Sequence, residues 1–176
     1  MKILGIDPGT NILGYAIVQG KGSSAELIAS GILDLRKEKD DYRKLERIFS
    51  AVTEIINSYQ PDECAVESPF YGKNAQSMLK LGRAQGVAIA AAMSKGLPVT
   101  EYAPRKVKIA VTGNGNASKD QVARMVETIL HIKATDKKAD ETDAMAIALC
   151  HFFNHKSQSA GQYSSWKDFA RKNNLL

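Results

Sequence analysis

Three strand-like segments precede the first helix-like segment of this sequence, and this order constrains the fold more than any other feature. Lys2–Asp7 is an apolar run that Pro8 breaks, and Gly14–Val18 is a second apolar run after a Pro-Gly-Thr-Asn turn sequence. Ala25–Leu35 follows as the third segment. Because short connections join antiparallel neighbours, we expect a three-stranded antiparallel meander at the start of the chain.

Helix-like and strand-like segments alternate in the rest of the sequence. Apolar residues at three- and four-residue spacing, or helix formers between start and stop signals, predict the helices. The predicted helices are 41–59, 73–95, 104–111, 118–130 and 140–154, and the predicted strands between them are 63–67 and 99–102. This order predicts an α/β fold with a five-stranded mixed sheet, antiparallel in its first three strands and flanked by helices.

The composition fits a single domain with a tail. The chain has 176 residues, of which 44% are hydrophobic, which is enough to bury a core. After His155 the sequence shifts to Ser, Gln, Gly and Lys, so we expect a domain over 1–155 and a polar, flexible tail over 156–176. Trp166 and Phe169 lie three residues apart, which leaves open a short docking helix in this tail.

The charge and cysteine content narrow the class of protein. Lys and Arg number 24 against 19 Asp and Glu, and the resulting net charge of +5 mildly favours a nucleic-acid partner. Cys64 and Cys150 lie in apolar segments, so we expect buried free thiols in a reducing compartment. No apolar run approaches the ~18 residues of a membrane span, and no signal-peptide core is visible, so we expect a cytoplasmic protein and no membrane partner.

Four acidic residues stand at positions where carboxylates are unusual or paired. Asp7 and Glu67 each end an apolar strand, where an ionised carboxylate needs a partner. Asp140 and Asp143 are three residues apart, so both project from one side of the last predicted helix. Turn formation explains either strand-end acid alone, and helix capping explains the helical pair alone.

The four acids together favour a metal centre. Hard divalent cations such as Mg²⁺ take several oxygen ligands, here from separate rigid elements, and the absence of a sequence-adjacent His or Cys argues against zinc. Two ions about 4 Å apart activate a water and stabilise the leaving oxygen in phosphodiester hydrolysis. The sequence therefore predicts a nuclease with Asp7, Glu67, Asp140 and Asp143 as catalytic metal ligands.

Several short motifs occur together around these acids. They are Ile-Asp-Pro-Gly-Thr-Asn at 6–11, Glu67 with Phe70 and Lys-Asn-Ala-Gln-Ser at 73–77, Leu-Lys-Leu-Gly-Arg at 79–83 with Gly-Val at 86–87, and Ala-Asp-Glu-Thr-Asp-Ala at 139–144. Over roughly residues 1–154 the sequence thereby resembles the RuvC family of bacterial crossover-junction endodeoxyribonucleases.

The resemblance has implications for fold and function. It implies an RNase H-like fold, a homodimer, and dependence on Mg²⁺ or, as a substitute, Mn²⁺. It also implies paired symmetric nicks in a four-way (Holliday) DNA junction, with 5′-phosphate and 3′-hydroxyl ends, during recombination and DNA repair. A short thymine-containing cutting site and a branch-migration complex of RuvA and RuvB as partner are further implications.

The resemblance also assigns roles to residues outside the acidic set. Lys108 and Lys119 match lysines that handle DNA and assist catalysis, where a positive charge can stabilise the pentacovalent phosphate. Phe70 matches an aromatic residue that stacks at the junction centre, with Tyr71 beside it. An ordinary surface position for the lysines and a packing role for the aromatics are the alternatives.

The predicted helix over 73–95 carries two patterned surfaces. Lys73, Gln76, Lys80 and Arg83 form a polar stripe that, together with Asn74, we predict to contact DNA, although a solvated helix face would look the same. Gly82, Gly86 and Ala90 at four-residue steps form a smooth strip suited to close packing in the core or in a dimer.

Three other functions remain open at the level of sequence. The same acids would serve an RNase H-like nuclease acting on RNA or on other branched DNA. Asp7 and Gly9 ahead of a hairpin are also compatible with the ATP-using actin and sugar-kinase clan, although 176 residues leave no room for its second lobe. A catalytically inactive junction-binding module is the third.

Overall fold

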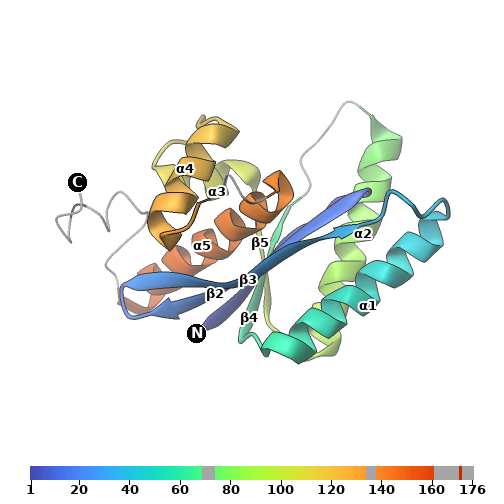
Figure 1. Ribbon diagram of the computed structural model, residues 1–176, viewed down its shortest axis with the longest axis horizontal. Helices are drawn as coiled ribbons and strands as arrows, with labels where there is room; N and C mark the ends of the chain where they lie inside the picture. Colours follow the sequence, from blue (N-terminus) through green and yellow to red (C-terminus); the bar gives the residue numbers. More distant parts are fainter. Residues whose placement is uncertain (69–73, 134–137, 161–170, 172–176) are drawn as a thin grey trace.

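The computed structural model describes residues 1–68, 74–133, 138–160 and 171, which form three layers with a sheet in the middle (Figure 1). Helices α1 and α2 cover one face of the sheet, and α5, with α3 and α4 beside it, covers the other. The elements are β1 (Lys2–Asp7), β2 (Ile12–Lys21), β3 (Ser24–Asp34), α1 (Asp41–Tyr59), β4 (Glu63–Glu67), α2 (Ala75–Ser94), β5 (Val99–Tyr102), α3 (Pro104–Thr112), α4 (Lys119–Leu130) and α5 (Ala139–Ala160).

The sheet has the order β3-β2-β1-β4-β5. Its first three strands pair antiparallel, and β4 and β5 continue the sheet parallel to β1. A parallel neighbour requires a crossover connection, and α1 and α2 supply the two crossovers. The predicted five-stranded mixed sheet is therefore confirmed.

The two-residue period of β1 divides its side chains between the two helical layers. Leu4 and Ile6 are fully buried in the core under α1 and α2, whereas Ile3 belongs to the core under α5. The same alternation directs Gly5 and Asp7 toward α5. The central strand thus ends on a carboxylate that faces the last helix.

Two glycines let α5 lie directly on the backbones of β1 and β2. A Cβ atom at Gly5 would come within 2.3 Å of the Ala144 carbonyl oxygen, and one at Gly14 within 2.0 Å of the Asp140 carbonyl oxygen. Real side chains never approach backbone so closely, so no larger residue fits without moving the helix. The first turn of α5 is therefore held over the β1–β2 pair by close backbone contact.

Replacing Gly14 by Ala should displace the start of α5. We expect a loss of roughly 3 kcal/mol in unfolding free energy, the upper end of ordinary overpacking, because the added methyl group meets backbone atoms rather than a flexible side chain. Denaturant unfolding followed by circular dichroism measures this loss. Wild-type stability in the variant would mean that the helix does not rest on Gly14.

The predicted order of elements is confirmed, but some boundaries differ. Strand β2 runs over Ile12–Lys21, beyond its predicted range of Gly14–Val18, because its pairing with β3 continues to Lys21. Ser118 caps α4 in a capping box, and both cysteines are buried and free, as predicted for the thiols. The helix predicted over 73–95 instead begins at Ala75, because the Asn74 side chain accepts hydrogen bonds from the backbone N–H groups of Gln76 and Ser77. Helix α5 continues to Ala160, six residues beyond its predicted end at 154. In the described ranges, no helix has the length and apolar character needed to cross a membrane.

Candidate active site

Asp7 and Glu67 lie side by side at the carboxyl ends of two neighbouring strands in the interior of the sheet. Strands β1 and β4 are parallel, and their register pairs Ile6 with Val66, so the next residue of each strand is an acid. Both side chains are partly buried. The carboxyl ends of adjacent parallel strands therefore bring together two acids that are sixty residues apart in the sequence.

Helix α5 brings Asp140 and Asp143 to the same place. Gly14 pairs with Asp7 across β1 and β2, and Gly14 is also the residue on which the Asp140 backbone rests. The acid between them is used differently, because Glu141 accepts a hydrogen bond of 2.8 Å from the Ser30 hydroxyl of β3. Only the two acids spaced three residues apart share the side of Asp7, in agreement with the predicted helical spacing.

The pKa values of the strand-end acids record this crowding. Burial is the largest of the causes that together raise the pKa of Asp7 to about 8, and the nearby charges of Glu67, Asp143 and Asp140 follow in that order. Burial, followed by the Asp143 charge, raises the pKa of Glu67 as well. Four carboxylates from three elements are thus close enough to interact electrostatically. Their negative charges repel one another, and a bound cation would relieve this repulsion.

The acids are crowded but do not form a ready-made ligand set. Within the described part of the chain, no group of three or more His, Cys, Asp or Glu side chains is arranged to hold a metal ion. A donor set of four carboxylates fits a hard divalent cation.

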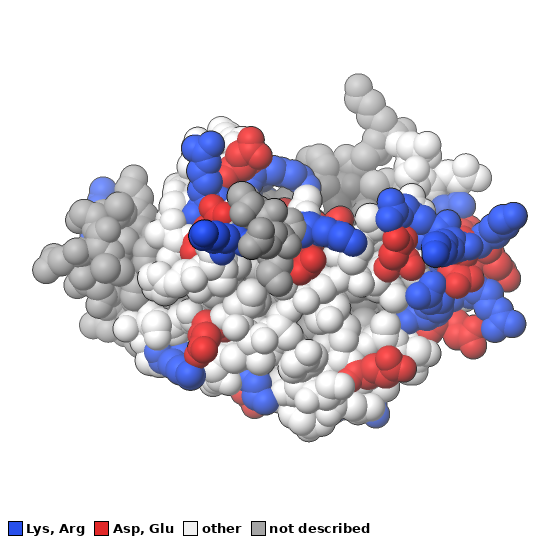
Figure 2. Space-filling view, in the orientation of Figure 1, with Lys and Arg blue, Asp and Glu red and all other residues white. Residues whose placement is uncertain are grey.

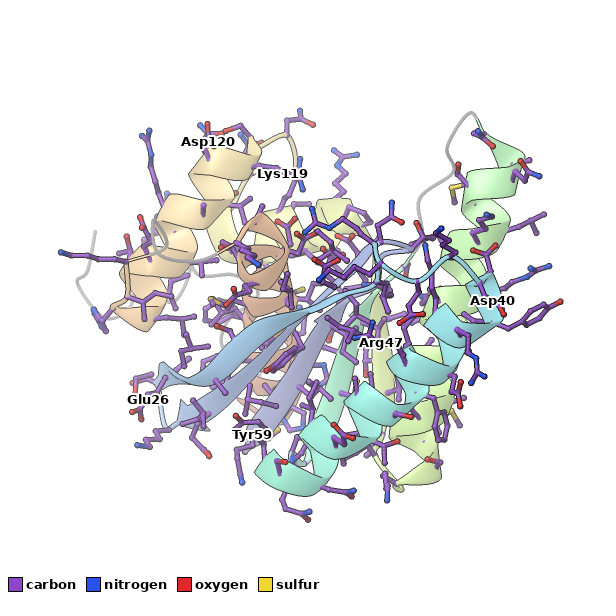
Figure 3. All side chains as sticks on the ribbon, turned by 45° about the vertical axis from the view of Figure 1, so that its right-hand side comes forward. Glu26, Asp40, Arg47, Tyr59, Lys119 and Asp120 are labelled. Carbon is purple, nitrogen blue, oxygen red and sulfur yellow. The ribbon has the colours of Figure 1, made fainter. Side chains whose placement is uncertain are left out.

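Two lysines extend from separate helices toward the acids. Lys119, at the start of α4 (Figure 3), forms an ion pair of 2.7 Å with Asp143 and also acts electrostatically on Asp7. This ion pair is the first cause of a raised Lys119 pKa. Lys108 of α3 lowers the pKa of Glu67 through its charge, which places it in the same electrostatic environment. Both lysines therefore interact electrostatically with the acids.

The predicted DNA-contacting stripe has mixed placements. Gln76 and Arg83 are exposed on α2, and Lys80 forms an ion pair of 2.9 Å with Asp41 of α1. The side-chain oxygen of Asn74 accepts the capping hydrogen bonds of α2. The N–H groups of the same side-chain amide are therefore the part available to a ligand. Phe70, Tyr71 and Lys73 lie outside the described residues.

Sequence reasoning missed the specific partners of these side chains. The ion pair between Lys119 and Asp143 joins residues 24 apart, and the hydrogen bond between Ser30 and Glu141 joins residues 111 apart. Neither pair follows a periodic spacing that would have revealed it. The one available signal was the i, i+3 spacing, which separates Asp140 and Asp143 from Glu141.

Comparison with known proteins gives the family. A family model described as crossover junction endodeoxyribonuclease RuvC matches residues 3–151, which is most of the chain. The chain belongs to the RuvC family. The RuvC of Bacteroides fragilis is 55% identical to it, over 97% of this chain and 93% of the relative.

Solved structures agree with this membership. RuvC of Thermus thermophilus in complex with a Holliday junction substrate superposes with a TM-score of 0.85 at 34% identity, over 90% of this chain and 97% of that one. The yeast mitochondrial Holliday junction resolvase Ydc2 shares the fold, with a TM-score of 0.64 at 15% identity, over 89% of this chain and 83% of that one. The predicted membership of the RuvC family and the predicted RNase H-like fold are therefore confirmed.

Proposed function

We propose that this chain resolves four-way DNA junctions by hydrolysing phosphodiester bonds at the Asp7 site with divalent metal ions. The observation that carries the proposal is the electrostatic coupling of Asp7 to Glu67, Asp143 and Asp140, which come from three separate elements. The Holliday junction substrate bound to the Thermus thermophilus relative supports the choice of DNA substrate. An enzyme acting on RNA or on other branched DNA would need a different substrate surface around the same acids.

The four carboxylates would hold Mg²⁺, or Mn²⁺ in its place, at two adjacent positions. When bound, the two ions would activate a water as nucleophile and stabilise the leaving 3′ oxygen, leaving 5′-phosphate and 3′-hydroxyl ends. The contribution of the protein is to hold the carboxylates on rigid elements, with Asp7 and Glu67 on strands and the other two on α5.

Lys119 and Lys108 would place positive charge beside the reacting phosphate. A phosphate gains negative charge in the pentacovalent transition state, and fixed cations stabilise that charge more strongly at a partly dehydrated site. Lys119 already contacts an acid of the centre, through its 2.7 Å ion pair with Asp143. We therefore assign Lys119 the role nearest to the reacting atoms and Lys108 a supporting role near Glu67.

A homodimer would provide the second active site. A four-way junction has twofold symmetry, so paired nicks require two symmetry-related centres. The exposed face of α2 suits such a contact: Leu79 and Met93 are 65% and 64% exposed, and added Cβ atoms at Gly82 and Gly86 would touch no neighbour within 4 Å. This openness favours the dimer over core packing as the use of the smooth strip.

The remaining roles follow the family. Phe70, with Tyr71, would stack on bases at the junction centre, and Lys73, Asn74, Gln76, Lys80 and Arg83 would contact the DNA backbone. RuvA and RuvB would be the partners in branch migration, in the bacterial cytoplasm, during recombination and repair. The stacking and partner roles rest on the family resemblance. The backbone contacts rest on it as well, together with the polar, exposed side chains of α2.

A cleavage assay on synthetic substrates tests the proposal. We expect symmetric paired nicks in a four-way junction with Mg²⁺, none with EDTA, and little cutting of linear duplex DNA or an RNA–DNA hybrid. Preferential cutting of the hybrid would instead assign an RNA substrate. Junction binding without cutting in any divalent ion would assign a binding module.

A further inference from the structure

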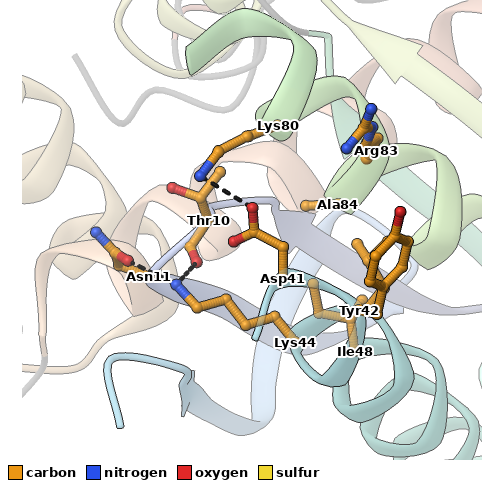
Figure 4. A pocket seen from close by; sticks show the side chains of 10 residues that line it. Thr10, Asn11, Asp41, Tyr42, Lys44, Ile48, Lys80, Arg83 and Ala84 are labelled. Carbon is orange, nitrogen blue, oxygen red and sulfur yellow. Dashed lines mark hydrogen bonds and ion pairs between the residues drawn. The ribbon is translucent and has the colours of Figure 1, made fainter. Parts of the chain in front are cut away.

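A pocket lies between the first two turns of α1, the first half of α2 and the turn that joins β1 to β2 (Figure 4). Of the described residues that line it, three are cations, Lys44, Lys80 and Arg83, and Asp41 is the acid. Figure 2 shows Lys and Arg mixed with Asp and Glu at the end of the molecule where α1 begins, whereas the lower face carries few charges. The pocket therefore has an excess of positive charge.

Asp41 stands among these cations. Its carboxylate forms a 2.9 Å ion pair with Lys80, and both side chains are about half exposed, at 47% and 49%. The hydrogen bond from Lys80 is the first cause of a lowered Asp41 pKa, and the charges of Lys80, Lys44 and Arg83 contribute to it. A single carboxylate that feels three cations is in the electrostatic position that an anionic ligand would take.

Lys44 connects the pocket to the catalytic strand. Its ammonium group donates hydrogen bonds of 3.2 Å to the Thr10 carbonyl oxygen and of 3.2 Å to the Asn11 side-chain oxygen. Thr10 follows Asp7 by three residues, so their Cα atoms are at most roughly 11 Å apart. Phosphates follow one another every ~3.4 Å along the helix axis of one DNA strand, so a strand at Asp7 reaches the pocket within a few nucleotides.

We propose that this pocket binds a backbone phosphate of the DNA, and that Asp41 occupies the place of that phosphate in the free protein. Lys80 then exchanges Asp41 for the phosphate when DNA binds, while Lys44 and Arg83 hold the other phosphate oxygens. The inference rests on the proposed DNA substrate. It adds Lys44 to the residues that contact the DNA and identifies Asp41 as an anion that competes with the phosphate. An ordinary surface ion pair is weak enough to be exchanged in this way.

The proposal predicts opposite effects for the two kinds of charge. Lys44→Gln should weaken junction binding about 3- to 10-fold and reduce the slope of log affinity against log salt by about 0.9, the value for one phosphate contact. Asp41→Asn should strengthen binding about 2- to 5-fold, because no carboxylate then competes for Lys80. In a Lys80→Gln background this gain should disappear.

Fluorescence anisotropy with a labelled four-way junction measures these effects, in EDTA and at several salt concentrations. Lys95→Gln, an exposed cation at the far end of α2, is the matched control and should keep wild-type affinity. Arg83→Gln is a second test of the pocket, because Lys44 also supports the β1–β2 turn and its loss could alter folding. Unchanged affinity and slope in Lys44→Gln and Arg83→Gln, or weaker binding by Asp41→Asn, would overturn the proposal.

Failure of this inference can be told apart from failure of the proposed function. If the wild-type protein cuts junctions with Mg²⁺ while both pocket variants bind normally, only the phosphate pocket is wrong. If the variants show the expected binding changes but the wild-type protein never cuts DNA, the pocket stands and the nuclease function is wrong.

Discussion

Replacing Asp7 by Asn should reduce the rate of junction cleavage by at least about 1,000-fold, equivalent to roughly 4 kcal/mol of transition-state stabilisation. Asp7 is the acid that interacts with the other three, so its loss removes the central carboxylate of the proposed metal site. Junction affinity in EDTA should stay within about threefold of wild type, because Asp7 contributes to catalysis rather than to phosphate binding. Single-turnover cleavage and anisotropy measure the two quantities separately.

Glu141→Gln is the matched control for this variant. Glu141 lies in the same turn of α5 as Asp140 and Asp143, but its side chain is directed to Ser30 of β3, and a glutamine oxygen can accept the same hydrogen bond. We expect cleavage within a few-fold of wild type. If Glu141→Gln abolished cutting as completely as Asp7→Asn, the loss would reflect the general integrity of α5 rather than a carboxylate site.

The second large effect concerns stability without metal. The Asp7 carboxyl has a pKa of about 8 in the folded protein and a usual value of 3.8. Between these values the folded state binds more protons than the unfolded state, so the stability from protonated Asp7 is complete below 3.8 and is lost as pH rises through 8. In EDTA, the unfolding free energy of the wild-type protein should therefore fall across this range on account of Asp7.

Asp7→Asn should remove this pH dependence. Each unit of pKa shift is worth about 1.4 kcal/mol, so removing this buried and crowded carboxylate relieves a few kcal/mol at pH 8. For a chain of this size that corresponds to a melting temperature roughly 5–10 °C above wild type in EDTA. Mg²⁺ should raise the wild-type melting temperature and leave the variant nearly unchanged, because ligands stabilise the state that binds them. A variant that melts below wild type at pH 8 in EDTA would contradict the crowding of these acids.

The sequence predicted much of this fold because its local patterns agree with one another. Apolar runs bounded by Pro and Gly located the strands, and the order of segments predicted the mixed sheet. Strand alternation and helical spacing placed Asp7, Glu67, Asp140 and Asp143 on elements that the structure brings together. Helix ends were less accurate, since capping by Asn74 and the continuation of α5 to Ala160 depend on local competition among several possible boundaries.

Contacts between distant segments could not be predicted in the same way. The pocket cations come from α1 and α2, and their common position depends on how the two crossover helices pack. Likewise, Glu63 at the start of β4 meets His151 of α5 at 2.7 Å, and the other ring nitrogen of His151 meets the Tyr102 hydroxyl at 2.9 Å. Such side-chain pairs follow from tertiary packing, which no single-sequence periodicity reports.

The most direct test of the four-carboxylate metal site is anomalous diffraction from crystals of this protein soaked in Mn²⁺. Anomalous density should lie against the Asp7 carboxylate, within coordination distance of at least one of Glu67, Asp140 and Asp143, and should disappear in Asp7→Asn crystals. Density that leaves Asp7 without a metal contact, at a Mn²⁺ concentration that supports full cleavage in solution, would contradict the proposed active site.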